Sequence, residues 1–117
     1  MSDKIKVYQK PTCSKCRTTI GILKERGVDF EAIDYYEDTL TTDDIRKLID
    51  QLGIKPIELV RKDEKVFRDL GLSDRYASDD ELIKLMVENP DLIQRPIVVR
   101  GNKAVLGRPP ETVEELL

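Results

Sequence analysis

The sequence predicts a mixed α/β domain whose elements follow the order β-α-β-α, a helical middle, then β-β-α. The first half alternates apolar strand-like runs with helical patterns, an arrangement that implies parallel strands. Near the C-terminus, two short apolar runs flank the turn Arg100–Lys103, which predicts an antiparallel hairpin. The sheet should therefore be mixed, and the 117 residues are enough for one domain with one core.

The first three predicted elements are a strand, a helix and a second strand, and the two cysteines lie at the start of the helix. Lys4–Gln9 is an apolar run that predicts a strand, and Ser14–Arg26 predicts a helix because its apolar residues recur on one face. Gly27 is suited to end this helix. Apolar and acidic residues alternate through Val28–Ala32, which predicts a half-buried strand.

The middle of the chain is predicted to be helical. Thr41–Asp44 resembles a capping box and precedes a strongly amphipathic pattern, so a helix should begin there. Lys55–Leu72 predicts short helical turns, and Ser78–Glu81 resembles a second capping box that begins another helix. We expect a helical insertion over about residues 54–90.

The C-terminal part returns to the sheet. Ile97–Val99 and Ala104–Leu106 predict the two hairpin strands, and a last helix should begin near Pro109. Cys13, in the turn after the first strand, lies at the carboxyl edge of the sheet, where open α/β sheets build their sites. Together these features predict a thioredoxin-like fold formed by a single domain over residues 1–117.

Composition narrows the function classes. There are 20 Lys plus Arg against 23 Asp plus Glu, a net charge of −3, which disfavours nucleic acids and anionic membranes as partners. The chain contains no histidine, which excludes histidine bases and ligands. Without a secretory signal or a membrane-length apolar run, we expect a soluble cytoplasmic protein with reduced cysteines.

The cysteine pair Cys13-Ser14-Lys15-Cys16 is the strongest chemical signal. A helix N-terminus stabilises an anion, so Cys13 is placed to be a nucleophilic thiolate. A zinc site would need two further ligands, and a disulfide closing so short a loop would add little stability. We therefore predict a redox or nucleophilic thiol at Cys13 and no bound metal or cofactor. Cys16 is either a resolving thiol or a buried, passive residue.

Three arginines form the second signal. Arg61, Arg95 and Arg108 lie in unusually apolar or proline-rich settings, although most arginines of a charged protein are simply solvated. Arg95 precedes Pro96, where thioredoxin-like folds often place a cis-proline that faces the cysteine. Guanidinium groups suit tetrahedral oxyanions such as arsenate or phosphate. A thiolate with convergent arginines would form an oxyanion-binding redox site.

Several segments, spread over nearly the whole chain, match a known family in order. The segment Asn89–Val99 is the most specific of them, because the cysteine spacing alone would not identify a family. The matching segments are Pro11–Arg17, Leu59–Lys62, Asp69–Leu72, Asn89–Val99 and Gly107–Glu111.

These segments resemble the glutaredoxin-dependent arsenate reductases and their relatives. The resemblance implies that Cys13 attacks arsenate and that Arg61, Arg95 and Arg108 bind the oxyanion. It also implies an enzyme of arsenic detoxification that uses glutathione with glutaredoxin, or thioredoxin, as external reductant.

Cys16 departs from the single-cysteine reductases, which commonly have serine there. The two-cysteine form also resembles the Spx-type regulators, so the alternative function is a redox-sensing regulator that binds RNA polymerase. A third possibility is a relative that acts on another oxyanion or disulfide.

Overall fold

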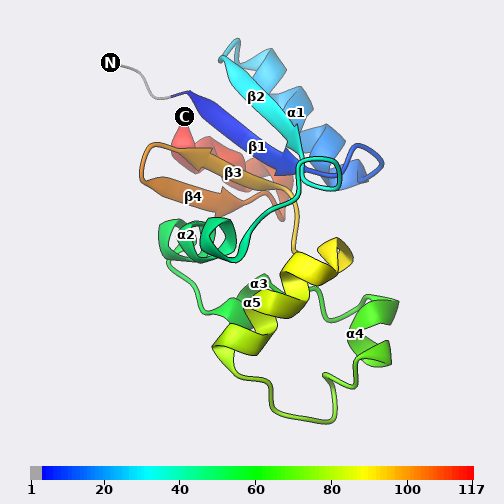
Figure 1. Ribbon diagram of the computed structural model, residues 1–117. Helices are drawn as coiled ribbons and strands as arrows, with labels where there is room; N and C mark the ends of the chain where they lie inside the picture. Colours follow the sequence, from blue (N-terminus) through cyan, green and yellow to red (C-terminus); the bar gives the residue numbers. More distant parts are fainter. Residues whose placement is uncertain (1–3) are drawn as a thin grey trace. The chain divides into compact units, whose positions relative to one another are not determined.

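The protein is described by a computed structural model that covers residues 4–117. It divides into two compact units (Figure 1). The first contains the residues up to Asp38 together with Arg95–Leu117, and the second contains Thr39–Gln94. The insertion predicted over about 54–90 lies within the second unit, which also includes the preceding helix. The single domain over 1–117 stays a prediction.

The first unit carries the four-stranded sheet, with strand order β2-β1-β3-β4. Strands β1 and β2 are parallel, whereas β1 with β3 and β3 with β4 are antiparallel, so the predicted mixed sheet and hairpin are confirmed. The elements of this unit are β1 (Ile5–Gln9), α1 (Ser14–Glu25), β2 (Phe30–Asp34), β3 (Ile97–Arg100), β4 (Lys103–Leu106) and the 3₁₀ helix η2 (Pro110–Leu116).

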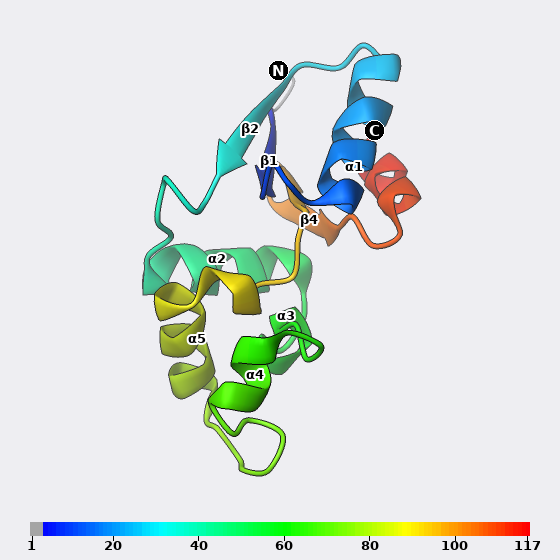
Figure 2. The ribbon, with the colours of Figure 1, turned by 90° about the vertical axis from the view of Figure 1, so that its right-hand side faces the viewer.

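Helices α1 and η2 cover one face of this sheet, as Figure 2 shows. Burial of aliphatic side chains stabilises this layer, at about 1.5–3 kcal/mol for each large side chain that leaves water. Because β1 and α1 both contribute to the core, the short loop between them, which carries Cys13, is held at both ends. The buried side chains are those of Ile5, Val7, Leu23, Val98, Val113 and Leu116.

The second unit consists of helices. The short helices predicted over Lys55–Leu72 are present as α3 and α4, and Pro56 begins the first of them, as predicted. The elements are α2 (Thr42–Leu52), α3 (Pro56–Leu59), α4 (Lys65–Asp69), α5 (Asp79–Glu88) and the 3₁₀ helix η1 (Pro90–Leu92).

The start of β2 and the type of the C-terminal helix differ from the sequence predictions. Strand β2 begins at Phe30 rather than Val28, because the Val28 N–H donates to the Leu23 carbonyl and completes the C-terminal cap of α1. Gly27 makes this cap with a φ of 66°. The C-terminal helix is a 3₁₀ helix rather than an α-helix. Within residues 4–117, no helix is both long and apolar enough to span a bilayer.

Candidate active site

Cys13 is the N-cap residue of α1. Its own N–H donates to the Lys10 carbonyl at 2.9 Å, and its Sγ accepts a hydrogen bond from the Cys16 N–H at 3.4 Å. The first N–H groups of a helix lack partners within the helix, and a Ser, Thr or Asp oxygen usually accepts from one of them. Here a sulfur atom takes that place, so the helix itself favours the thiolate form.

Three residues around the Cys13 sulfur favour its ionisation. Burial acts to raise the pKa of Cys13, but hydrogen bonds from the Cys16 side chain and from the backbone of Cys16 and Lys15 act against it. The positive charge of Arg95 adds to them, and the net effect lowers the pKa of Cys13 below its ordinary value. The thiol is half-buried, so it is also accessible to a reactant.

Cys16 has the opposite character. Its side chain is completely buried, and burial raises its pKa to about 12, with a smaller contribution from the adjacent Cys13. Neither cysteine is in a disulfide. At neutral pH, Cys16 is therefore a neutral thiol that donates a hydrogen bond to Cys13. The pair consists of one activated sulfur and one protonated sulfur.

Arg95 lies beside this pair. It lies two residues before the start of β3, the strand next to β1, and its bond to Pro96 is cis, as predicted. The side chain is almost completely buried, with 6% exposed. Burial acts to lower the pKa of Arg95, but interactions with Tyr35, Tyr36 and Cys13 outweigh it and raise the pKa. Arg95 therefore keeps its positive charge, and this charge acts on the Cys13 sulfur.

Arg108 is connected to Arg95 through the backbone. Its Nη1 donates to the Arg95 carbonyl at 3.3 Å. The bond from Arg108 to Pro109 is also cis, which the sequence analysis did not predict. The structure thus brings Cys13, Cys16 and Arg95 together and joins Arg108 to Arg95.

Gly107 allows the segments around these arginines to approach closely. A Cβ atom at Gly107 would lie 2.7 Å from Cγ of Pro96 and 2.8 Å from Oγ1 of Thr19, closer than real Cβ atoms come. Its N–H also donates to the Pro96 carbonyl at 2.9 Å. Glycine is therefore required where the end of β4, the cis-proline and helix α1 meet.

Arg61 belongs to the second unit. Its backbone N–H donates to the Leu92 carbonyl at 2.7 Å, and its guanidinium faces the carboxylates of Glu64 at 3.5 Å and Asp63 at 3.9 Å. These contacts define its local setting, in which two acidic side chains offset the charge of the guanidinium. Its role as an oxyanion ligand stays a prediction.

Tyr35 is a site residue that the sequence analysis missed. It follows β2, is 1% exposed, and forms a side-chain hydrogen bond with Arg95. A signal was present, because two tyrosines come directly after a strand that is parallel to the one leading to Cys13. The carboxyl ends of such strands share one edge of the sheet.

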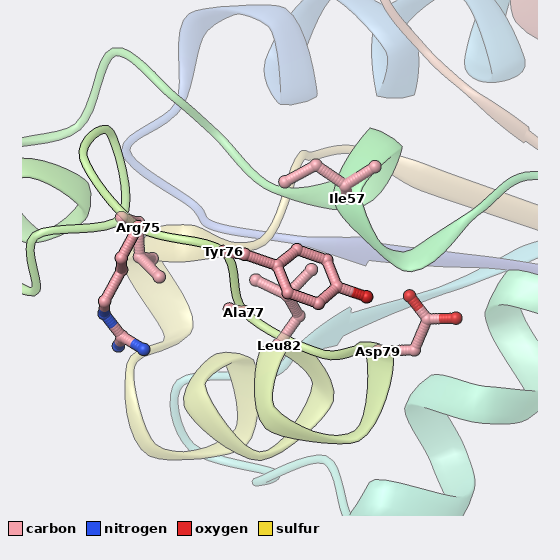
Figure 3. A pocket seen from close by; sticks show the side chains of 7 residues that line it. Ile57, Arg75, Tyr76, Ala77, Asp79 and Leu82 are labelled. Atoms are coloured by element: carbon pink, nitrogen blue, oxygen red, sulfur yellow. The ribbon is translucent and has the colours of Figure 1, made fainter.

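A separate pocket of about 200 Å³ lies in the second unit (Figure 3). Its apolar wall includes Ile57 and Leu82, and Arg75 and Asp79 also line it. The Arg75 guanidinium already donates to the Glu81 carboxylate at 2.8 Å. The pocket contains no cysteine and none of the predicted oxyanion-binding arginines, so we do not assign the redox chemistry to it. Among residues 4–117, no three Cys, Asp or Glu side chains cluster as metal ligands.

The fold and the site define a class. A mixed four-stranded sheet, a cysteine pair on the first turn of α1 and a cis-proline before β3 together make this a thioredoxin-like protein. A sequence model of the ArsC family matches residues 8–116. The chain belongs to the ArsC family.

Individual relatives match almost the whole of this chain. The chain is 42% identical over 118 residues to the uncharacterized protein YfgD of Escherichia coli, covering 100% of this chain and 99% of that one. It is 38% identical over 113 residues to an arsenate reductase of Escherichia coli, covering 97% of this chain and 80% of that one. The solved structure of an arsenate reductase from Vibrio cholerae matches with a TM-score of 0.93 and 37% identity, covering 100% of both chains.

Proposed function

We propose that the protein is a cytoplasmic oxidoreductase that reduces arsenate to arsenite through an adduct on Cys13. The observation that carries the proposal is the half-buried Cys13 sulfur, which has a lowered pKa and lies at the N-terminus of α1 beside the buried charge of Arg95. Relatives named arsenate reductase support the choice of oxyanion.

In the first step, the Cys13 thiolate attacks As(V). A bond forms between sulfur and arsenic, and an arsenate hydroxyl group takes up a proton and leaves as water. The oxidation state of arsenic does not change here. We assign to Arg95 and Arg108 the neutralisation of the oxyanion and of the charge that develops on it, because forked guanidinium donors suit such a group. Arg61 is the third predicted ligand.

In the second step, another thiolate attacks the Cys13 sulfur. A disulfide forms, the bond between sulfur and arsenic breaks, and its electron pair remains on arsenic, which leaves as arsenite. Two thiols are thereby oxidised while As(V) becomes As(III). An external thiol then reduces the disulfide. The lowered pKa of Cys13 makes it a good leaving group when that disulfide is attacked.

We propose that the second thiol is external, supplied by glutathione with glutaredoxin. Cys16 is fully buried and its pKa is raised to about 12, so at neutral pH it is rarely the thiolate that this attack requires. A disulfide between Cys13 and Cys16 would then be a side product of oxidation. In the other route, Cys16 resolves the adduct and thioredoxin sustains the cycle.

An arsenate reduction assay tests both parts of the proposal. Wild type and Cys16→Ser are each supplied with glutathione plus glutaredoxin or, separately, with thioredoxin. We expect turnover with glutathione and glutaredoxin, and we expect Cys16→Ser to retain most of it. Loss of that activity in the variant, with a mass decrease of two daltons in wild type after one turnover, would establish Cys16 as the resolving thiol. Oxidation of the pair without any arsenate turnover would contradict the enzyme and favour the redox regulator.

A further inference from the structure

Tyr35 leaves the sheet at the same edge as the loop that carries Cys13. Strands β1 and β2 are parallel, and their last paired residues are Gln9 and Asp34, so Lys10 and Tyr35 are the next residues along each strand. Lys10 in turn accepts the hydrogen bond from the Cys13 N–H. The buried Tyr35 side chain therefore lies in the same part of the first unit as the cysteine loop.

The ring of Tyr35 is fixed by its neighbours. Its centroid lies 5.1 Å from that of Tyr36, and the Lys10 Nζ lies 4.9 Å from the centroid of the Tyr36 ring. The Tyr36 N–H donates to Oδ1 of Asp34 at 2.9 Å, which fixes the backbone between the strand and the two rings. A tyrosine held in this way has little freedom to move its hydroxyl group.

The Tyr35 hydroxyl group is hydrogen-bonded to the side chain of Arg95. Buried tyrosines usually find a partner for their polar end, and here the Tyr35 side chain is hydrogen-bonded to Arg95. Both side chains are nearly completely buried, at 1% and 6% exposed. An arginine side chain has many rotamers, so a fixed acceptor at its end selects one position for the charge.

We propose that Tyr35 is a positioning residue of this site, whose hydroxyl group accepts a hydrogen bond from Arg95 and holds the guanidinium beside the Cys13 sulfur. The effect of Tyr35 on arsenate reduction rests on the proposed function. Its effect on the pKa of Cys13 does not depend on that function.

A phenol suits this task better than a carboxylate. A carboxylate would neutralise Arg95 and repel both the Cys13 thiolate and an incoming oxyanion. A neutral hydroxyl group fixes the guanidinium and leaves its charge for the sulfur and the substrate. Arg61 illustrates the other arrangement, because its guanidinium faces the carboxylates of Glu64 and Asp63.

The variant Tyr35→Phe tests the proposal, because it keeps the buried ring and removes only the hydroxyl group. We expect the alkylation rate of Cys13 by iodoacetamide near neutral pH to fall about threefold, which corresponds to about half a unit of pKa. The midpoint of its pH profile should rise, and thermal unfolding should shift little. Tyr76→Phe is the matched control, since Tyr76 is 87% exposed and lies in the second unit.

A double variant shows whether Tyr35 acts through Arg95. In an Arg95→Met background, adding Tyr35→Phe should cause no further loss of alkylation rate. An equal loss in both backgrounds would overturn the proposal, as would an unchanged pH profile in Tyr35→Phe alone. Alkylation needs no arsenate, so a protein that fails to reduce arsenate can still confirm or refute the role of Tyr35.

Discussion

The N-termini of helices α1 and α2 are built differently. In α2, the Thr41 hydroxyl accepts from the Asp44 N–H at 3.1 Å, and the Asp44 carboxylate accepts from the Thr41 N–H at 2.9 Å. In α1, the cap is the sulfur of Cys13, and the first turn contains Lys15 and no carboxylate. Acidic side chains at α2 neutralise the positive end of the helix, whereas at α1 that end remains available to a thiolate. The difference separates a helix start whose own side chains stabilise it from one whose cap is the sulfur that we propose to be the nucleophile.

The largest effect should come from replacing the sulfur while keeping the cap. Serine is a good N-cap residue, so Cys13→Ser should preserve α1 and change the free energy of unfolding by less than about 1 kcal/mol. Without the nucleophile, arsenate turnover should fall by about 10³-fold or more. Thermal unfolding and turnover of the same sample check this. A variant that unfolds readily would mean that the sulfur is a structural cap as well.

Arg95, whose charge acts on Cys13, and Arg108, which donates a hydrogen bond to the Arg95 carbonyl, should show the next largest effect. Arg95→Lys and Arg108→Lys keep the charge but lose the planar fork, so turnover should fall by about tenfold or more. Thermal stability should change little. Arg68→Lys is a suitable control, because this exposed arginine lies in α4. Normal turnover in both site variants would show that these arginines do not bind the oxyanion.

A carboxylate placed on the first turn of α1 would give this helix an acidic N-terminus like that of α2. Lys15→Glu should stabilise the helix by about 0.3–1 kcal/mol but raise the pKa of Cys13 by adding negative charge near the thiolate. Alkylation near neutral pH should slow severalfold, and the pH profile of its rate should move to higher pH. Lys24→Glu is the matched control, about 13 Å away along the same helix. An equal effect at Lys24 would mean that net charge, not the helix N-terminus, controls the thiol.

The smallest effect on activity should come from the α2 cap. Thr41→Ala removes the acceptor for the Asp44 N–H and should cost about 1 kcal/mol of stability. Turnover per folded molecule should not change, because Thr41 belongs to the cap that serves stability. Denaturant unfolding and the arsenate assay measure the two quantities. A marked loss of turnover at a temperature where the variant is folded would contradict this division.

Local signals along the chain were sufficient for most elements. Thr41 and Asp44 form the predicted capping box because both partners lie within one helical turn. Gly53 ends the same helix in the left-handed conformation that glycine favours, with a φ of 68°. The cysteine spacing and its position after the first strand likewise indicated a thiolate at a helix start, since the amides that favour it come from the same turn.

The strand boundary near Val28 was predicted wrongly because two local signals competed. Alternation of apolar and acidic residues favours a strand from Val28, whereas Gly27 favours a helical cap that uses the Val28 N–H. Pairing with β1 decides the start, since Phe30 lies opposite Ile5 at the beginning of the ladder. A partner strand is distant information that the local pattern does not contain.

The sequence by itself determined the candidate nucleophile, its helix and the candidate arginines, because residue type and spacing along a few turns specify each of them. Only the tertiary structure decided that Cys16 is completely buried and that Tyr35 is bonded to Arg95. These properties arise where β1, β2 and the start of β3 meet at one edge of the sheet. The pKa of Cys13 depends on a charge contributed from far along the chain, and folding alone brings that charge to the sulfur.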